Sequence, residues 1–222
     1  MSTAFPALMR KVFVWMTLAL AITGLTAYGV ATSPAILSLI FSSKVTFFGL
    51  IIAEFALVFA ISGAINRLSL STATMLFILY SVINGATLSS IFFAFSVATI
   101  SKVFFITAGT FGAMALVGYT TKTDLTSMGK LLFMALLGII IASVVNMFVA
   151  SSGLDLILSY VGVLVFVGLT AYDTQKIKQM CQAAPDASES TQKLALIGAL
   201  SLYLDFINLF LYLLRIFGNN RD

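Results

Sequence analysis

The chain has 222 residues, of which 60% are hydrophobic and only 9% are charged, and its formal net charge is +4. Soluble domains contain roughly 25% charged residues, and a soluble fold of this composition would expose apolar surface and aggregate. We therefore predict an integral, multi-pass membrane protein. The single cysteine, Cys181, excludes an intrachain disulfide, and the absence of histidine removes the usual side chain for proton-linked chemistry near neutral pH.

Seven stretches are apolar enough and long enough to cross a bilayer, because a hydrocarbon core of about 30 Å needs about 20 residues of helix. In chain order the predicted spans are Val12 to Thr32, Val45 to Ile65, Thr72 to Phe95, Val103 to Thr120, Leu131 to Ala150, Leu154 to Tyr172 and Leu194 to Leu214. The three prolines lie outside these spans, so nothing breaks the helices. We predict an all-α fold with a single transmembrane domain over residues 1–222.

The first span follows Arg10 and Lys11, as a signal peptide would. Its apolar stretch of about 20 residues exceeds the roughly 7–15 residues of a cleaved signal, so we expect it to be retained. The longest polar stretch, Gln175 to Lys193, is the only sizeable loop that we predict, and it includes an extension of the sixth helix.

Basic residues in short loops indicate the orientation, because they remain on the cytoplasmic side. With a cytoplasmic N-terminus, one side carries Arg10, Lys11, Arg67, Lys122, Lys130, Lys176, Lys178 and Lys193, and the other side carries Lys44, Lys102, Arg215 and Arg221. This excess favours a cytoplasmic N-terminus. A six-span arrangement with a re-entrant last segment is the structural alternative.

Three carboxylates lie in or beside the predicted spans: Glu54 in the second, Asp173 at the end of the sixth and Asp205 in the last. An ionisable group in a bilayer core costs about 2.5–3.5 kcal/mol on insertion scales. Each of these carboxylates therefore needs an explanation. For Asp205 the simplest explanation is that it is protonated and only forms a hydrogen bond with a neighbouring helix.

The last span carries its polar residues on one helical stripe, because Ser201, Asp205, Asn208 and Tyr212 follow one another at i, i+4, i+7 and i+11. We expect this stripe to face other helices or water. Asp173 and Asp205 can meet, since the last two spans are antiparallel, provided that the sixth helix extends past Tyr172 or the last begins early. Two carboxylates 4 Å apart repel by about 4 kcal/mol at an effective dielectric of 20, so a pair sharing one proton would titrate as a unit and would sense pH without histidine.

Two arginines are candidate partners for these acids. Arg67 closes the second span on the side of Asp173, and Arg215 closes the last span on the side where it could reach Glu54. Ordinary anchoring at the lipid head groups explains both arginines equally well.

Further polar residues within the spans indicate the wall of a cavity. They are Tyr80, Ser81, Asn84, Thr87 and Ser89, with Gly85 among them, in the third span, Asn146 in the fifth, and Ser201 and Asn208 in the last. Packing hydrogen bonds between helices would account for them as well. Small residues four apart, such as Ala108 with Gly112 and Gly109 with Ala113, suit close helix packing.

Two segments resemble a known family. ALSLYLDFINLFLYLLRIFG (Ala199 to Gly218) and GLTAYDTQKIK (Gly168 to Lys178) are similar to the transmembrane Bax-inhibitor-motif, or Bax inhibitor-like, family, and YSVINGATLS with Glu54 fits the same pattern. The resemblance implies six helices around a central seventh, and a pH-sensitive calcium leak as the activity. It implies that Asp173 and Asp205 form the proton sensor and a possible calcium site, that Arg67 stands at the place of the arginine beside them, and that Glu54 pairs with Arg215.

The resemblance further implies that the partners are the bilayer, calcium ions and protons, with no cofactor, and it points to a bacterial plasma membrane. The chain has no phosphate-binding loop and no metalloprotease motif, and its sparse basic residues argue against nucleic acid. We predict that it is not an enzyme. One alternative is an intramembrane aspartyl protease, although the Gly-x-Gly-Asp and Pro-Ala-Leu elements are missing. Another is a non-conducting regulator of membrane proteases or cell-death partners.

Overall fold

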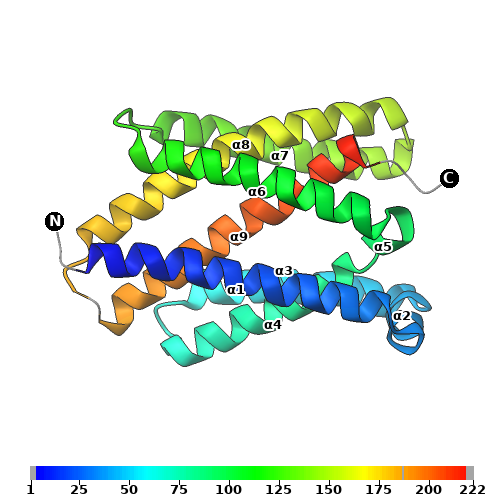
Figure 1. The fold of residues 1–222 in the computed structure, drawn as a ribbon, viewed down its shortest axis with the longest axis horizontal. Coiled ribbons are helices and arrows are strands. Elements are labelled where there is room, and N and C mark those ends of the chain that lie inside the picture. Colours follow the sequence, from blue (N-terminus) through cyan, green and yellow to red (C-terminus); the bar gives the residue numbers. More distant parts are fainter. Residues whose placement is uncertain (1–3, 187, 219–222) are drawn as a thin grey trace. The chain divides into compact units, whose positions relative to one another are not determined.

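The computed structural model describes residues 4–186 and 188–218, and all the regular secondary structure in these ranges is α-helical. In chain order the helices are α1 (Phe5–Ala31), α2 (Pro34–Phe41), α3 (Lys44–Ala64), α4 (Leu70–Leu88), α5 (Ile91–Ala94), α6 (Val97–Thr120), α7 (Thr126–Val149), α8 (Ser152–Ala183) and α9 (Glu189–Phe217) (Figure 1). Arg221, one of the basic residues used above for orientation, lies outside the described ranges.

Seven segments of the described chain are long and apolar enough to span a membrane. They are α1, α3, α4 together with α5, α6, α7, α8 and α9. The predicted all-α membrane class and the number of spans are therefore confirmed. α9 is the most buried of the seven, while its place at the centre of six others stays a prediction.

Local sequence explains where several helices begin. Ser69 and Ser96 cap α4 and α6, because each side chain accepts a hydrogen bond from the backbone N–H of the threonine three residues later, at 3.1 and 3.2 Å. Pro6 and Pro34 occupy the first turns of α1 and α2, where the missing N–H has no intrahelical partner to lose. The prolines thus start helices and interrupt none.

The chain divides into two compact units, and α8 and α9 contribute to both. The first unit contains Met1–Ala94 with Met180–Tyr203, and the second contains Phe95–Gln179 with Leu204–Asp222.

In the first unit, α4 packs against both α1 and α3 (Figure 1). Gly85 of α4 permits the close approach to α1, since a Cβ there would lie 2.6 Å from the carbonyl oxygen of Thr23. The ring of Tyr203 from α9 fills the interior of this unit, edge-on to Phe77 and Tyr80 at 5.8 and 5.7 Å.

In the second unit, glycines allow α8 to pack closely on its neighbours. Gly118 of α6 lies against the backbone of Ala171, and Gly129 of α7 lies against the ring of Tyr172. The small residues that we expected to mediate packing do not do so: added Cβ atoms at Gly109 and Gly112 would meet nothing within 4 Å. That prediction was wrong because residue spacing does not show which face of α6 meets α8.

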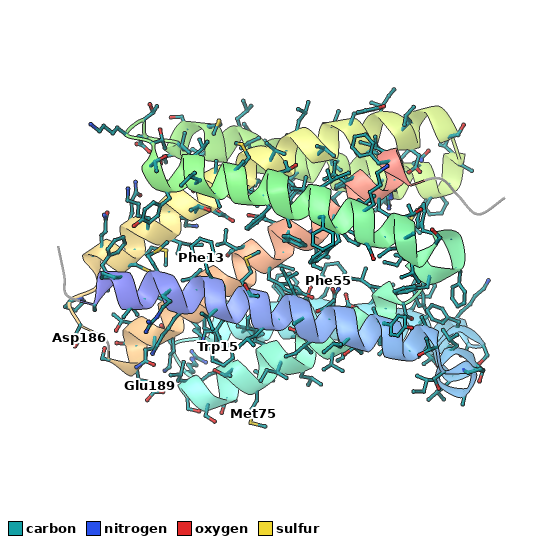
Figure 2. The ribbon with its side chains drawn as sticks, viewed as in Figure 1. Phe13, Trp15, Phe55, Met75, Asp186 and Glu189 are labelled. Carbon is teal, nitrogen blue, oxygen red and sulfur yellow. The ribbon has the colours of Figure 1, made fainter. Side chains whose placement is uncertain are left out.

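The outward faces of several helices are strongly apolar. Val45 is 82% exposed and Phe148 is 86% exposed, and Met75 projects away from α4 (Figure 2). In water such a surface would be a liability, whereas lipid tails solvate it without penalty. The faces that these residues occupy are therefore lipid-facing.

Candidate functional site

The side chains of Asp173 on α8 and Asp205 on α9 are hydrogen-bonding neighbours. They meet because α8 continues past Tyr172 to Ala183 and α9 already begins at Glu189. Both conditions under which the sequence predicted their contact are therefore fulfilled. Asp205 is only 5% exposed. Asp173 is half-buried and lies one helical turn from the positive charge of Lys176, which acts on it electrostatically.

One oxygen of this pair is unsatisfied. Asp205 Oδ2 is buried and has no hydrogen-bond partner among the described residues. Leaving such a group unpaired costs about 1–3 kcal/mol, and more when it is charged, so unpaired groups in folded proteins mark functional positions or sites for water or ions. The pair can therefore accept a proton, a water molecule or a cation at this atom.

Packing around the pair fixes both helices. Phe206, next to Asp205, contacts Phe104 and Phe111 of α6 with ring centroids 5.5 and 5.4 Å apart. Ala171 and Tyr172, just before Asp173, are the residues that meet Gly118 and Gly129. Both acids thus sit on backbone held by close contacts of α6 and α7.

The predicted calcium site at Asp173 and Asp205 has limited ligand capacity. Calcium takes 6–8 oxygen ligands, and the described part of the chain contains no group of three or more His, Cys, Asp or Glu side chains placed to hold a metal ion. A calcium ion at this pair therefore stays a prediction.

Glu54 of α3 is part of a second polar cluster, in the first unit. Its Oε1 accepts a hydrogen bond from the Thr87 hydroxyl at 2.6 Å, and its Oε2 accepts one from Asn84 Nδ2 at 3.1 Å. Both partners lie on α4. Each oxygen of Glu54 therefore has a donor, in contrast to Asp205.

The cluster continues into the core of the unit. The hydroxyl of Tyr203, fully buried, bonds Asn84 Oδ1 at 2.9 Å and Thr23 Oγ1 at 2.6 Å. Thr23 also bonds the carbonyl oxygen of Ser81 at 2.9 Å. A chain of hydrogen bonds thus joins α1, α9, α4 and α3.

Arg215, the predicted partner of Glu54, has a partner within its own unit. Its Nη1 lies 3.9 Å from Asp155 Oδ1, and its guanidinium lies 5.6 Å from the centroid of the Tyr212 ring. These three residues and Asn146 line an open hollow of about 660 Å³ beside the ends of α7, α8 and α9. Asn146 therefore lines a hollow within the second unit, while the cavity wall that it was predicted to share with the third span stays a prediction. Glu54 and Arg215 belong to different units, so their pairing stays a prediction.

Other predicted site residues have varied surroundings. Tyr80, Ser81 and Asn84 are buried. Ser201 is half-buried, and Asn208 donates to the carbonyl oxygen of Leu204 in its own helix at 2.8 Å. Arg67 is exposed in the turn after α3, in a different unit from the two aspartates, so its contact with them stays a prediction.

Three residues of these clusters were missed by sequence reasoning: Thr23, Asp155 and Tyr203. Thr87 was found because it belongs to the run of polar residues in the third predicted span, where it lies three residues after Asn84 and shares a face of α4 with it. Thr23 and Tyr203 carry no such signal, because a single threonine or tyrosine in an apolar helix is ordinary.

Loop carboxylates outside the spans have structural roles. Asp124 accepts hydrogen bonds from the hydroxyl and backbone N–H of Thr126 at 2.6 and 2.9 Å, and these bonds hold the pKa of Asp124 below its usual range. The side chain of Gln175 closes the same loop by bonding the carbonyl oxygen of Thr123 and the N–H of Leu125 at 2.8 and 2.9 Å.

Fold and site together define a polytopic α-helical membrane protein with carboxyl groups clustered inside its spans. The family model described as "Inhibitor of apoptosis-promoting Bax1" matches residues 6–222. The chain belongs to this Bax inhibitor-like family, as its last two helices indicated.

Bacterial relatives cover nearly the whole chain. It is 52% identical over 214 residues to the inner membrane protein YbhL of Escherichia coli, and the matched region covers 96% of this chain and 92% of YbhL. It is 50% identical to an uncharacterised protein of Borreliella burgdorferi, with the same coverage. It is 45% identical to one of Rickettsia prowazekii, over 96% of this chain and 90% of the relative.

Proposed function

We propose that the protein is a pH-sensitive leak for calcium or similar cations, gated by Asp173 and Asp205. The observation that carries this proposal is the pair itself: two carboxyl groups in hydrogen-bonding contact within spanning helices, one of them with a buried oxygen that has no partner among the described residues. Such a pair is more stable when the two carboxyl groups share one proton than when both are ionised. Its protonation state biases the contact between α8 and α9, and with it the open or closed state.

The chemistry of the pathway follows from the same side chains. Carboxylate oxygens are hard ligands of the kind that calcium prefers. A deprotonated pair offers negative charge to a cation, and a protonated pair does not. Asp155, beside the open hollow with Arg215, supplies a first carboxylate at the end of the second unit. Glu54 with Arg215, and Arg67 with the aspartates, are the further contacts that we propose along the route.

The membrane setting belongs to the proposal as well. An inner membrane relative in Escherichia coli supports a bacterial plasma membrane. The excess of basic residues in the loops assigned to the cytoplasm supports a cytoplasmic N-terminus.

Calcium flux in proteoliposomes tests the gate. We expect the flux to change between about pH 6 and pH 8, and Asp205→Asn to remove this dependence, because an amide cannot take part in the shared protonation. Asp124→Asn is the matched control, since it changes an exposed loop aspartate, and it should preserve the pH profile. An Asp205→Asn profile that matches the wild type would refute the gate.

An intramembrane aspartyl protease is the second candidate, because paired aspartates also activate water in that class. The adjacency of Asp173 and Asp205 favours it as much as it favours a gate. Incubation with a labelled transmembrane peptide separates the two: cleavage that stops in Asp173→Ala would identify a protease. A folded protein that neither conducts nor cleaves would instead indicate a regulator of other membrane proteins.

A further inference from the structure

The hydrogen-bond chain through Thr23, Tyr203 and Asn84 in the first unit has more hydrogen-bonding contacts than hydroxyl protons to donate to them. The hydroxyl groups of Thr23 and Tyr203 own one proton each. Together they take part in three contacts, with the carbonyl oxygen of Ser81, with each other, and with Asn84 Oδ1, at 2.9, 2.6 and 2.9 Å. With the oxygen of the Asn84 amide facing Tyr203, two protons must serve three contacts. One contact therefore lacks its donor.

A half-turn of the Asn84 amide removes this shortage. Asn84 Nδ2 then donates to the hydroxyl of Tyr203, Tyr203 donates to Thr23, and Thr23 donates to the carbonyl oxygen of Ser81. All three contacts have a proton. The two orientations of an amide occupy the same space and differ only in which atom is donor and which is acceptor.

The reversed chain places a requirement on Glu54. In this orientation Asn84 Oδ1, an acceptor, faces Glu54 Oε2, which is an acceptor when the carboxyl is ionised. The contact at 3.1 Å then needs a proton on Glu54. The other oxygen of Glu54 keeps the Thr87 hydroxyl as its donor in either case. When Glu54 is ionised, the hydroxyl of Tyr203 donates toward Asn84 and α3. When Glu54 is protonated, the hydroxyl of Tyr203 donates toward Thr23 and α1.

We propose that Glu54 is a second proton-binding site of the protein, distinct from the aspartate pair, and that the buried hydroxyl of Tyr203 reports its state through reversal of this chain. One proton from the medium binds Glu54 Oε2. The amide of Asn84 turns over, and the hydroxyls of Tyr203 and Thr23 rotate. No covalent bond breaks in the chain, and each hydroxyl keeps its own proton.

Few other titratable groups lie on the helices of the first unit that pack against α3. Within the described part of the first unit, α4 and α2 pack against α3. Tyr80 is the only titratable residue of α4, and α2 has none. Tyr203 of α9 is the next titratable group, reached through Asn84. Tyr203 stands two residues before Asp205 on α9, the helix that carries the gate proposed above.

Infrared difference spectroscopy in lipid nanodiscs tests the proposal without requiring ion flux. As the pH changes from about 9 to about 4, we expect a carboxylic acid carbonyl band that is absent from Glu54→Gln. We expect the phenol band of Tyr203, identified by its loss in Tyr203→Phe, to shift with the same midpoint. Because the readout is spectroscopic, a failure of conduction does not affect it.

Three variants make the test specific. Glu54→Gln should fix the Tyr203 band at one position at all pH values, because the amide cannot ionise. Asn84→Leu should separate the two bands, with Glu54 still titrating and Tyr203 no longer responding. Ser81→Ala is the matched control: its hydroxyl bonds the carbonyl oxygen of Phe77, while the backbone carbonyl that serves the chain remains, so both bands should still shift together.

Three results would overturn the proposal. The first is a wild-type protein in which no band of Glu54 titrates over this range. The second is a Tyr203 band that stays fixed while Glu54 titrates. The third is a Tyr203 band that still follows pH in Glu54→Gln, a conservative variant that is expected to fold even if Asn84→Leu does not.

Discussion

Two acidic sites within the spans differ in how completely their oxygens are paired. Glu54, in the first unit, receives one donor at each oxygen. Asp205, in the second, is a hydrogen-bonding neighbour of another acid and has a buried oxygen without a partner among the described residues. Both sites contain carboxyl groups, but each oxygen of Glu54 has a hydrogen-bond donor, whereas one oxygen of Asp205 has none among the described residues.

We interpret this difference in hydrogen bonding as a difference in role between Glu54 and the aspartate pair. A carboxyl group whose oxygens both have donors holds helices together in its ionised form. An acid paired with an acid, with an unsatisfied oxygen, is a site of stored free energy that a proton or cation can release. The aspartate pair therefore fits the gate that we propose, while Glu54 joins α3 to α4 and is the second proton-binding site that we propose.

The largest effect that we expect concerns the framework of the aspartate pair. Gly118→Ala places a Cβ against the backbone of Ala171, so α8 must shift, and we expect a loss of about 3 kcal/mol in the free energy of unfolding. Denaturation in mixed detergent micelles measures it. The pH dependence of flux should change as well, since Asp173 moves with the helix.

Gly112→Ala is the matched control on the same helix, since a Cβ there meets nothing within 4 Å. It should be neutral or stabilise the protein by about 0.5–1 kcal/mol. Equal effects of the two substitutions would show that close packing of α6 on α8 does not hold the pair.

Removal of Glu54 should destabilise the first unit. Glu54→Leu deletes the acceptor of two interhelical hydrogen bonds, which are worth about 0.6–1.7 kcal/mol each in membranes, so we expect a loss of about 1–3 kcal/mol. Phe55→Leu, at the next residue and 62% exposed, is the control and should leave the unfolding free energy unchanged. A stable Glu54→Leu protein would mean that pairing at Glu54 contributes nothing to the fold.

Asp205→Asn should have the opposite sign. An amide can donate to Asp173 at every pH, whereas the wild-type pair loses its shared proton as the pH rises. Above that point we expect a gain of about 1 kcal/mol in stability, together with loss of the pH response. Asp155→Asn, which breaks an ion pair whose side chains are both more than half exposed, should change stability by less than about 1 kcal/mol. A destabilised Asp205→Asn would place the pair among ordinary structural contacts.

The smallest effect lies outside the membrane. Because hydrogen bonds from Thr126 lower the pKa of Asp124 in the folded state, this carboxylate stabilises the protein above its unfolded pKa, and the contribution disappears as pH falls through the lowered pKa. Asp124→Ala should therefore lower the unfolding temperature slightly at neutral pH and not at all in strong acid. A difference that persists in acid would contradict the role of the charge.

The sequence predicted the spans and one of the two sites. Apolar stretches of about 20 residues, separated by six polar interruptions, were enough for the membrane class and the number of helices. Asp173 and Asp205 were predicted to meet from the antiparallel order of the last two helices. The polar stripe of α9 was less informative, because Asn208 bonds its own helix and the residue that joins the cluster of Glu54 is Tyr203, which the stripe does not include.

Composition and spacing alone determined that this chain crosses a bilayer many times, because a 20-residue apolar helix satisfies its own backbone and needs no partner to be recognised. Tertiary structure alone decided which polar groups are paired. The hydrogen bonds of Glu54, Asn84, Tyr203 and Thr23 join four helices across up to 180 residues of sequence. Such contacts depend on how each helix is rotated about its axis, and that rotation is fixed by close packing at positions such as Gly85 and Gly118, which local sequence does not reveal.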